Sequence, residues 1–573
     1  MARPIPERQQ RPETFNFALD VVDKWAAQSP PMEAMLWVSS NGETVKLLSY
    51  RHFSKQSHRI AILLQQLGAR PGETMLMVLP RVQEWWEIAT AGLRSGIVIA
   101  PATTLLTAAD IEYRVRKSRA AIFVGNKDSV SKMLQIRNRC PSLRTIIQVD
   151  GSSGEGVTSL HKALLSIPPD AQYPTIRFPW NAPAIVYFTS GTSGLPKMVQ
   201  HNQVSYPLAH ASTGKYWLKL SPGDLCWNYT EQGWGKAAYS FFGAWNCGAS
   251  LFIWDDRQSF DPLSLLNIVN RFPITTMCVP PLAWRQLVTP KCREYYAKHR
   301  PKTLRECTSA GEPLDPEVIR QWQRLTGLSI REGYGQTEAI LMCGNYGDFP
   351  IKPGSMGKPL PGVPLTVIHP DGVETKAGEE GDIAILLSAN AGHESTFFGI
   401  FDGYVDDNGQ VARGERVIED SNGQIVQRWY MTGDRAMRDE DGYLWYVGRA
   451  DDVINSSGYR IGPFEVESTL HKHPAVAECA VISSPDEARG EVVKAVIVLT
   501  PGYPTSSTSN DALIKELQDF CKASSAPYKY PRKISFVEAE TLPRTTSGKT
   551  KRAELRKVEW RNAKAKARMA HKL

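Results

Sequence analysis

The feature that most constrains the fold of this chain is a loop of small residues that directly follows an apolar segment. Pro183–Thr189 is apolar enough to form a buried strand, and the sequence continues as Ser-Gly-Thr-Ser-Gly-Leu-Pro up to Lys197. Glycines let backbone N–H groups approach an anion, hydroxyls add donors, and a lysine supplies a positive charge. The loop is not a Walker A motif, which requires GxxxxGK[ST]. We expect it to hold phosphates, although a flexible surface loop would explain the same residues taken alone.

The segment before this loop alternates between two hydrophobic periods. Helical patterns and short apolar runs follow one another, which is typical of βαβ units and a parallel sheet. We expect helices at Arg51–Gly68 and Val82–Ser95, and strands at Glu73–Pro80, Gly96–Pro101, Ala120–Gly125 and Thr145–Asp150. Around residues 360–450, short strands with Gly and Asp turns, such as Gly381–Leu387 and Tyr443–Gly448, predict a β-rich subdomain.

A second domain is expected after Arg449, where the pattern changes again. Pro463 can open a helix, Val476–Ser483 and Glu491–Thr500 predict strands, and Asp511–Ala523 places its apolar residues on one helical face. About 120 residues of this kind are enough for a compact domain. The predicted fold class is α/β, with βαβ subdomains and a β-rich subdomain at residues 1–449 and a small α+β domain at residues 450–573.

The distribution of charge argues against nucleic acid as a partner. The 573 residues carry a formal net charge of +8, but ten Lys/Arg and two Asp/Glu lie between Lys549 and Leu573, so the rest of the chain is neutral. A neutral body with a basic tail lacks an extended phosphate-binding face. We interpret the tail as a solvated helix end.

The expected location is intracellular. Nine scattered cysteines without a CxxC pair indicate a reducing compartment rather than a disulfide framework or a zinc site. The N-terminus has neither the apolar region of a signal peptide nor the acid-poor character of a transit peptide, and no apolar run is long enough to span a membrane. The final His571-Lys572-Leu573 resembles the peroxisomal address Ser-Lys-Leu. We therefore expect a peroxisomal or otherwise cytoplasmic protein without a membrane span.

Five further motifs follow the phosphate loop in order. They are Gly311-Glu-Pro313, Arg331-Glu-Gly-Tyr-Gly-Gln-Thr-Glu338, Tyr430-Met-Thr-Gly-Asp434, the stretch Gly448–Gly462, and Pro543-Arg-Thr-Thr-Ser-Gly-Lys549. In this order and spacing the six motifs resemble those of the adenylate-forming superfamily, which includes acyl-CoA synthetases, peptide-synthetase adenylation domains and firefly luciferases. Gly448–Gly462, Ala526–Arg532 and Arg489–Lys494 are most similar to medium-chain acyl-CoA synthetases.

The resemblance implies a two-step reaction that uses ATP, Mg²⁺ and CoA. A carboxylate attacks the α-phosphorus of ATP to give an acyl-adenylate and pyrophosphate, and the thiol of CoA then displaces AMP. The first step brings anions together, so it needs cations and donors fixed in advance. Lys549 matches the lysine that bridges acyl and phosphate oxygens, Thr337 would contact the α-phosphate, and Glu338 would bind Mg²⁺. The β- and γ-phosphates would be held by Thr189, Ser190, Gly191, Thr192, Ser193, Gly194, Leu195, Pro196 and Lys197.

The resemblance also assigns the nucleoside half of ATP. Asp434 matches the residue that accepts hydrogen bonds from the ribose hydroxyls, for which a carboxylate offers two oxygens, and Arg449 would support the same ribose. The remaining residues implied for the ATP site, most of them lining the adenine, are Gly311, Glu312, Pro313, Glu332, Gly333, Tyr334, Gly335 and Gln336.

Thioester formation implies a mobile C-terminal domain. In the family this domain rotates between the half-reactions, and Asp451 matches the hinge, where a few residues absorb the dihedral change. The rotation would withdraw Lys549 and present a face to CoA. The candidate CoA-binding residues are Ser457, Gly458, Tyr459, Arg460, Arg489 and Arg532.

The acid is the least constrained part of the reaction. Gly335 stands where acetate- and propionate-activating relatives carry Trp, so acids longer than propionate are expected to fit. Thr230-Glu-Gln-Gly-Trp234 departs from the Ser-Asp-Thr-Gly-Trp of mammalian medium-chain relatives. We expect Trp234, Tyr239 and Gly335 to line the acyl pocket, and plain core packing is the alternative for the two aromatic residues.

The favoured function is therefore an ATP-dependent acyl-CoA synthetase for a medium-chain or aromatic acid. The alternative is a stand-alone adenylating enzyme that loads an acyl carrier protein. A nucleotide-binding scaffold without turnover would predict damage at Lys549, Glu338 or Asp434, and all three residues are intact.

Overall fold

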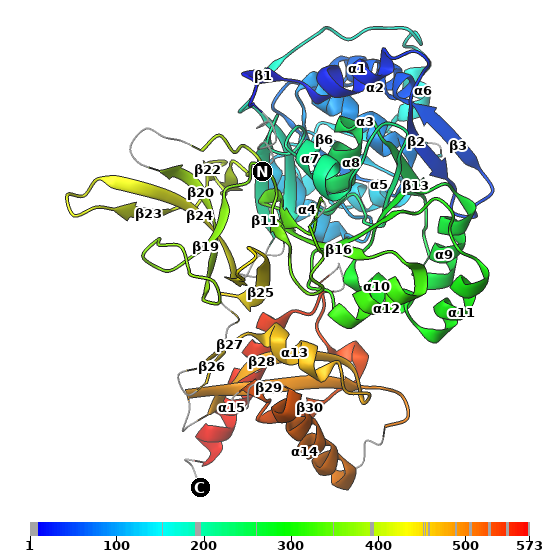
Figure 1. The fold of residues 1–573 in the computed structure, drawn as a ribbon. Helices are drawn as coiled ribbons and strands as arrows, with labels where there is room; N and C mark the ends of the chain where they lie inside the picture. The colour runs from blue at the N-terminus through cyan, green and yellow to red at the C-terminus, as the bar shows by residue number, and fades with distance from the viewer. Residues whose placement is uncertain are drawn as a thin grey trace, which may run out of the picture. The chain divides into compact units, whose positions relative to one another are not determined.

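The alternating segment before the phosphate loop forms the parallel part of a nine-stranded sheet, as predicted (Figure 1). The strand order is β22-β21-β11-β10-β5-β4-β6-β7-β8. The strands are β4 Thr74–Val78, β5 Val98–Ala102, β6 Ile122–Gly125, β7 Thr145–Gln148, β8 Thr158–Ser159, β10 Pro183–Thr189, β11 Lys197–Asn202, β21 Gly403–Val405 and β22 Val411–Ala412. The accompanying helices are α2 Tyr50–Gln66, α3 Gln83–Ser95, α4 Ala108–Ser118 and α5 Lys127–Leu134.

A second nine-stranded sheet has the order β18-β17-β16-β15-β14-β12-β13-β2-β3. Its strands from β2 to β16 are parallel, so their carboxyl ends meet at one edge, where ligands bind in open α/β sheets. The strands are β2 Glu33–Val38, β3 Val45–Ser49, β12 Leu225–Asn228, β13 Ser250–Trp254, β14 Thr276–Cys278, β15 Glu306–Ala310, β16 Ile330–Gln336, β17 Ala339–Gly344 and β18 Lys358–Pro359. The helices between them include α8 Ala237–Asn246, α9 Pro262–Arg271, α10 Pro281–Leu287, α11 Pro290–Lys298 and α12 Pro316–Thr326.

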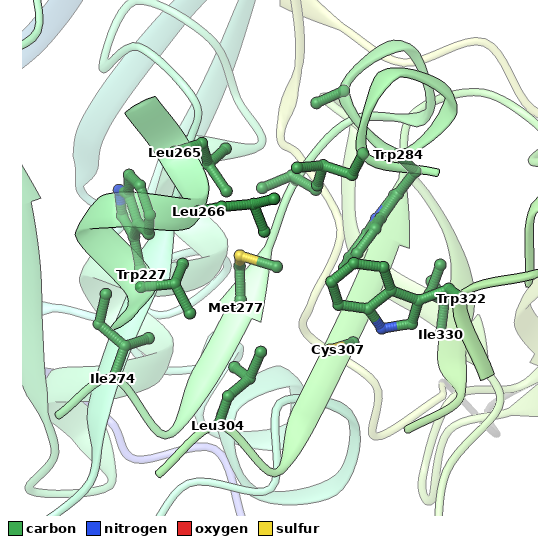
Figure 2. Close-up of a cluster of buried hydrophobic side chains, with 14 of the residues drawn as sticks. Trp227, Leu265, Leu266, Ile274, Met277, Trp284, Leu304, Cys307, Trp322 and Ile330 are labelled. Carbon is green, nitrogen blue, oxygen red and sulfur yellow. The ribbon is translucent and has the colours of Figure 1, made fainter. Parts of the chain in front are cut away.

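The second sheet is anchored by a cluster of buried aromatic and aliphatic side chains (Figure 2). Trp284 and Trp322 are fully buried, and their rings meet edge to face with centroids 4.9 Å apart. The Trp284 indole also donates to the carbonyl of Thr308 at 3.2 Å. Each buried large side chain contributes about 1.5–3 kcal/mol relative to exposure. The cluster therefore fixes the strands whose ends form the site.

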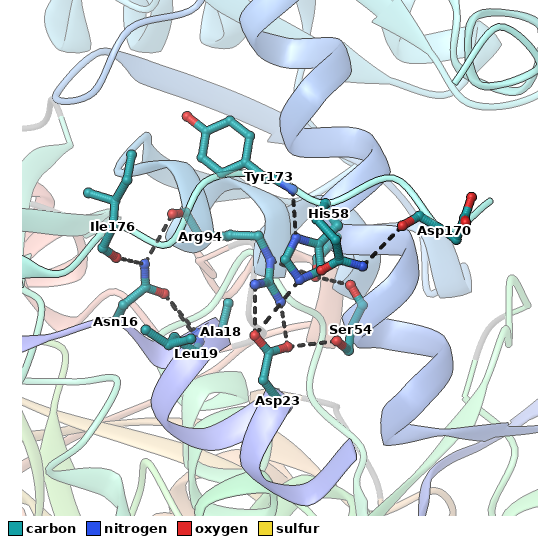
Figure 3. A network of polar contacts seen from close by, with 12 residues as sticks. Asn16, Ala18, Leu19, Asp23, Ser54, His58, Arg94, Asp170, Tyr173 and Ile176 are labelled. Carbon is teal, nitrogen blue, oxygen red and sulfur yellow. Dashed lines mark hydrogen bonds and ion pairs between the residues drawn. The ribbon is translucent and has the colours of Figure 1, made fainter. Parts of the chain in front are cut away.

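A buried polar network ties the N-terminal segment to α2 and α3 (Figure 3). The Asp23 carboxylate accepts two hydrogen bonds from the Arg94 guanidinium, at 2.8 and 2.7 Å, and one from Ser54 at 2.7 Å. His58 accepts a hydrogen bond from the backbone N–H of Tyr173 at 2.9 Å. Burial and the nearby Arg94 charge lower the pKa of His58 to about 4, so the ring stays neutral at physiological pH.

The β-rich region forms a five-stranded sheet, again as predicted. Its members are β19 Leu365–Ile368, β20 Glu380–Ala389, β23 Arg416–Glu419, β24 Ile425–Arg438 and β25 Leu444–Arg449. The last sheet consists of β26 Ile454–Ser456, β27 Tyr459–Ile461, β28 Val476–Asp486, β29 Gly490–Leu499 and β30 Lys533–Phe536. It is accompanied by α13 Pro463–Leu470, α14 Ser507–Ser524 and α15 Arg552–Ala570.

These elements belong to two compact units. The first unit is residues 1–365 and 385–430, and the second is residues 366–384 and 431–573. The domain boundary expected at residues 449/450 stays a prediction. The computed structural model describes residues 10–570 except 152, 190–195, 259, 348, 390–394, 451, 453, 457–458, 487–489, 504–506, 525–528 and 546–548. Within these described ranges, no helix combines the length and apolarity needed to cross a bilayer.

Candidate active site

The phosphate loop is closed at its base by a pair of neighbouring strands in the first unit. β10 and β11 are antiparallel, and Thr189 pairs directly with Lys197. The Tyr113 hydroxyl on α4 donates to the carbonyl of Pro196 at 2.7 Å. The intervening loop, residues 190–195, lies outside the described residues. The structure thus brings both ends of the predicted loop together and anchors one of them to α4.

Thr337 and Glu338 form the tight turn between β16 and β17. Two buried side chains hold the Thr337 carbonyl, since His201 Nε2 and the Tyr206 hydroxyl each donate to it at 2.7 Å. Burial lowers the pKa of His201 to about 3, so the ring is neutral. Because a carbonyl can only accept, Nε2 carries the proton and Nδ1 accepts from the Ser205 hydroxyl at 3.0 Å.

Gly235 lets the segment after Trp234 approach this turn closely. A Cβ at Gly235 would lie 3.1 Å from Thr337 Oγ1 and 3.2 Å from its Cγ2. These distances are tighter than ordinary van der Waals contact. The Thr230–Trp234 segment, whose sequence differs from that of the mammalian medium-chain relatives, is held by Glu231, which accepts a hydrogen bond from Thr103 at 2.5 Å. Thr337 is therefore packed closely against Gly235, and its carbonyl accepts hydrogen bonds from His201 and Tyr206.

The half-buried Glu338 carboxylate accepts a hydrogen bond from the Tyr404 hydroxyl at 2.7 Å. Across the described ranges, no group of three or more His, Cys, Asp or Glu side chains is arranged to hold a metal ion. Mg²⁺ is usually bound by one or two carboxylates together with substrate phosphates rather than by an all-protein cage. A single carboxylate of the first unit, linked through Tyr404 to the phosphate-loop residue Lys197, fits that mode of binding.

Glu332 and Gly311 shape the region implied to line the adenine. The Glu332 carboxylate is buried and accepts the backbone N–H groups of Leu314 at 2.9 Å and Gly354 at 3.0 Å. Burial raises the pKa of this carboxyl to about 8. Gly311 has φ +103°, a conformation that other residues rarely adopt. Glu332 thus braces the segment after Pro313, while Glu312, Pro313, Tyr334 and Gln336 are partly exposed.

The surroundings of Gly335 bear on the acyl pocket expected there. A Cβ at Gly335 would collide with the hydroxyl of Tyr239 and lie 2.9 Å from the carbonyl of Ile340. Tyr239 is 4% exposed. Tyr239 therefore lies directly beside Gly335, and the deeper acyl cavity expected at this glycine stays a prediction.

A tryptophan from another element lies under the same hairpin. Gly333 and Gly344 pair across β16 and β17, and Cβ atoms on them would lie 2.8 and 2.7 Å from the indole of Trp217. The Trp217 ring is fully buried and meets Tyr239 edge to face, with centroids 6.3 Å apart. Trp217 and Tyr239 therefore wall the region next to Gly335, and Trp234 is half-buried near Thr337.

The ribose candidates lie in the second unit, on paired strands. Asp434 of β24 pairs with Arg449 of β25, and their carboxylate and guanidinium are 3.6 Å apart. The Tyr446 hydroxyl donates to the same carboxylate at 3.3 Å. A Cβ at Gly433, whose φ is +76°, would lie 3.2 Å from the Arg449 guanidinium. The structure thus brings together the two residues predicted to bind the ribose.

Lys549 lies in a short hairpin of the second unit. Its backbone N–H donates to the Thr545 hydroxyl at 3.0 Å, and the Thr545 N–H donates back to the Lys549 carbonyl at 2.8 Å. Arg544 and Thr550 form a bridge just outside this turn. Lys549 itself is exposed. The predicted catalytic lysine thus lies opposite Thr545, and residues 546–548 between them lie outside the described residues.

The candidate CoA residues are only partly described. Tyr459 and Arg460 lie in β27, where they pair with Ser456 and Asn455. The Arg532 guanidinium donates to the Tyr530 hydroxyl at 2.6 Å and stacks on that ring. The other candidates lie outside the described residues, namely Ser457, Gly458, Arg489 and the hinge candidate Asp451.

A cavity of about 620 Å³ opens on the first unit. It is lined by apolar side chains, among them Ile340, Phe397 and Phe398, and by polar ones, among them Gln10, Ser212, Lys215 and Thr396. Its lining contains none of the residues predicted to hold ATP or the acid. The predicted site is therefore not this cavity.

Sequence reasoning missed four residues that shape the site, namely His201, Tyr206, Trp217 and Tyr404. A histidine four residues after Lys197, in the strand that leaves the phosphate loop, was a signal that could have been followed. The other three give no local signal, because their hydrogen-bond partners lie 66 to 131 residues away in the chain.

Two protein-family models match this chain. The model of the AMP-binding enzyme family matches residues 22–390, and the model described as AMP-binding enzyme C-terminal domain matches residues 465–549. The mitochondrial acyl-coenzyme A synthetase ACSM3 of Pongo abelii is 43% identical over 557 residues, which cover 96% of this chain and 90% of that protein. The mitochondrial acyl-coenzyme A synthetase ACSM5 of Mus musculus is 41% identical over 574 residues, covering 97% and 95%.

Solved structures are similar over nearly the whole chain. An acyl-CoA synthetase from Brucella canis aligns with a TM-score of 0.69 and 29% identity, covering 97% of this chain and 96% of that one. The anthranilate CoA ligase AuaEII in complex with anthranoyl-AMP aligns with a TM-score of 0.80 and 27% identity, covering 96% and 99%. The α/β architecture with a smaller C-terminal domain is confirmed.

The expected location is wrong. Relatives that match almost the full chain are named as mitochondrial, which contradicts the expectation of a peroxisomal or cytoplasmic protein. A match to a three-residue C-terminal address carries little information. Residues 571–573 also lie outside the described residues. The comparisons likewise give no support to an acyl carrier protein as partner.

Proposed function

This chain belongs to the AMP-binding enzyme family and is an ATP-dependent acyl-CoA synthetase that works through an acyl-adenylate, and we propose that it activates a medium-chain or aromatic acid with Mg²⁺. One observation carries the proposal for the chemistry. The turn that contains Thr337 and Glu338 is held by His201 and Tyr206, which lie in and just after the strand that leaves the phosphate loop. Groups proposed for the α-phosphate, the cation and the outer phosphates thus share one rigid support.

Adenylation needs negative charge to be neutralised where the carboxylate meets the α-phosphate. We propose that the phosphate loop holds the β- and γ-phosphates, that Thr337 donates to the α-phosphate, and that Lys549 stabilises the charge that develops between acid and phosphate. Glu338 would hold Mg²⁺, which neutralises phosphate charge when it is bound. Because His201 and Tyr206 occupy the Thr337 carbonyl, the orientation of that residue is set before substrate arrives.

Residues are also proposed for the nucleoside. Asp434 offers carboxylate oxygens to the ribose hydroxyls, and Arg449 orients that carboxylate through their 3.6 Å contact. In the first unit, the segment from Gly311 to Pro313, which directly precedes the braced Leu314, offers backbone to the adenine. CoA would be bound by the second unit, with Arg532 among the candidates for its phosphates.

The class of acid follows from the wall beside Gly335. Trp217 and Tyr239 are large, apolar and buried, and such walls suit an alkyl chain or an aromatic ring. The resemblance of Gly448–Gly462 to medium-chain enzymes favours a chain of medium length. The anthranilate ligase, similar over 96% of this chain, supports an aromatic acid as the second option. The mitochondrial relatives support a mitochondrial location.

A pooled-substrate assay tests this proposal. Purified protein is incubated with MgATP, CoA and a mixture of straight-chain, branched and aromatic acids, and the thioesters are identified by mass spectrometry. We expect acyl-CoA products from acids longer than propionate, with equal amounts of AMP. Products confined to acetate and propionate would contradict the proposed acid class. AMP and pyrophosphate without any thioester would contradict CoA as the acceptor.

A further inference from the structure

One short segment of the first unit joins the phosphate loop to the turn that carries Glu338. This bridge segment is Ile400–Val405. On one side it pairs with β11, where Val199 is opposite Tyr404. On the other side the Phe401 N–H donates to the Glu338 carbonyl at 2.8 Å. The bridge segment therefore forms backbone hydrogen bonds both with β11, the strand that leaves the phosphate loop, and with the Thr337–Glu338 turn.

The bridge segment is itself firmly held. The Asp402 carboxylate accepts a hydrogen bond from the Asn202 side chain at 2.6 Å, and the Asp402 N–H donates to the Gln200 carbonyl at 2.9 Å. Arg413 donates to the Phe401 carbonyl at 2.8 Å. These contacts fix the backbone that leads into Tyr404, so its side chain has a defined starting point.

Tyr404 contacts one charged group with each part of its side chain. Its hydroxyl donates to Glu338 Oε1 at 2.7 Å, a hydrogen bond strengthened by the charge of the acceptor. Its ring lies under the Lys197 ammonium, with Nζ 4.9 Å from the ring centroid, within the range of a cation–π interaction. One side chain thus links the end of the phosphate loop to the proposed cation ligand.

We propose that Tyr404 is a positioning residue that fixes the Glu338 carboxylate and the Lys197 ammonium relative to each other. With Oε1 held by the tyrosine hydroxyl, the carboxylate presents its other oxygen toward a phosphate-bound divalent cation. With its alkyl stem and charge held over the ring, Lys197 meets the phosphates in a set position. This inference rests on the proposed function, because it takes Glu338 as the cation ligand and Lys197 as a phosphate ligand.

The two contacts can be separated by substitution. Tyr404→Phe removes the hydroxyl and keeps the ring, so it releases Glu338 but leaves Lys197 stacked. Tyr404→Leu removes both contacts. A matched control is Tyr295→Phe on α11, which removes a hydroxyl that donates to Asn267 and lies in neither the phosphate nor the cation region.

The test measures binding by isothermal titration of the full chain with ATP in EDTA and with MgATP. The ratio of the two dissociation constants reports the contact between protein and cation, independently of turnover. For Tyr404→Phe we expect MgATP to bind about tenfold more weakly with metal-free ATP unchanged, since a hydrogen bond to a charged group is lost. For Tyr404→Leu we expect weaker binding of both forms. Tyr295→Phe is expected to match the wild type.

Three results would overturn the inference. Unchanged MgATP binding in Tyr404→Phe would show that the hydroxyl does not position Glu338. Equal weakening of ATP and MgATP in Tyr404→Phe would show a general structural role. A wild type that binds ATP and MgATP equally would remove Glu338 as the cation ligand. A wild type that binds neither form would contradict the proposed function itself, which separates that failure from the failure of the inference.

Discussion

The turn at Thr337 and Glu338 and the residue Lys549 are held in different ways. In the first unit, the turn is held by side chains from β11, from the segment after it and from β21. In the second unit, Lys549 is held by one local hairpin. His201, Tyr206 and Tyr404 all donate to this turn at 2.7 Å. The Lys549 hairpin is closed by hydrogen bonds to Thr545, four residues away.

The difference indicates a division of labour within one reaction. Groups that must hold phosphates and a cation at fixed distances are placed by buried contacts between segments far apart in the chain. A lysine that is proposed to act in only one half-reaction can lie in a local hairpin, because its position is set by the unit that carries it.

The largest expected effect concerns Lys549, in the second unit. Lys549→Ala is expected to lower the rate of adenylation on the order of 10²–10³-fold, as for the loss of one charge-stabilising group. Thioester formation from a supplied acyl-adenylate is expected to remain close to that of the wild type. Both half-reactions are measured by rapid quench, and Lys551→Ala serves as the control lysine. An equal loss in both half-reactions would show that Lys549 does not act on adenylation alone.

A smaller loss of adenylation rate is expected when one of the side chains that hold the Thr337 carbonyl is removed. His201→Leu takes away one of the two buried donors to the Thr337 carbonyl, so adenylation is expected to fall about tenfold. Since burial keeps the pKa of His201 near 3, the shape of the pH–rate profile above pH 5 is expected to stay the same. The exposed His299→Leu is the control. A normal rate in His201→Leu would mean that Tyr206 alone is sufficient.

Substitutions at Gly335 and Tyr239 test the proposed acyl pocket within the first unit. Gly335→Ala places a Cβ against the Tyr239 hydroxyl, so we expect the preferred acid to become shorter, with a several-fold shift in kcat/KM between neighbouring chain lengths. Gly335→Trp is expected to shift it further. Adding Tyr239→Phe to Gly335→Ala removes the clashing hydroxyl and is expected to restore the profile in part, since the Cβ still lies 2.9 Å from the Ile340 carbonyl. An unchanged profile in Gly335→Trp would place the acyl chain elsewhere.

The smallest effect concerns stability. The carboxyl of Glu332 has a pKa of about 8 in the folded chain against an ordinary value of 4.5. The stability that it contributes is therefore fully present below pH 4.5 and is lost as pH rises toward 8. We expect Tm to fall more between pH 5 and pH 8 in the wild type than in Glu332→Gln, by a few degrees. Calorimetry at both pH values checks this, and equal shifts would contradict the buried, protonated state.

The parts of the fold that were predicted have strong local patterns. β10 was expected at Pro183–Thr189 and is found there, because an apolar run stops abruptly at a loop of small residues. α2 and α14 were found within a few residues of their predicted ranges, since each has one apolar face. The second nine-stranded sheet was not predicted. Several of its strands are too short for a period to appear, such as β14 at Thr276–Cys278.

The site shows the same limit. Lys549, Glu338 and Asp434 could be singled out because each lies in one of six motifs whose order and spacing resemble a known family. Trp217 and Tyr404 could not, since their roles arise only when the chain folds and brings distant segments together. The contact between Gly335 and Tyr239 could not be predicted for the same reason, because it joins two segments that are far apart in the chain.

The most direct test of the account is to look for the acyl-adenylate itself. The chain is mixed with MgATP and an acid identified by the pooled assay, without CoA, and quenched for mass spectrometry before and after a chase with CoA. We predict that acyl-adenylate accumulates to at most one per active site and is converted by the chase into acyl-CoA and AMP in equal amounts. Acyl-CoA formed with release of ADP, or with no adenylate at any time point, would contradict the account.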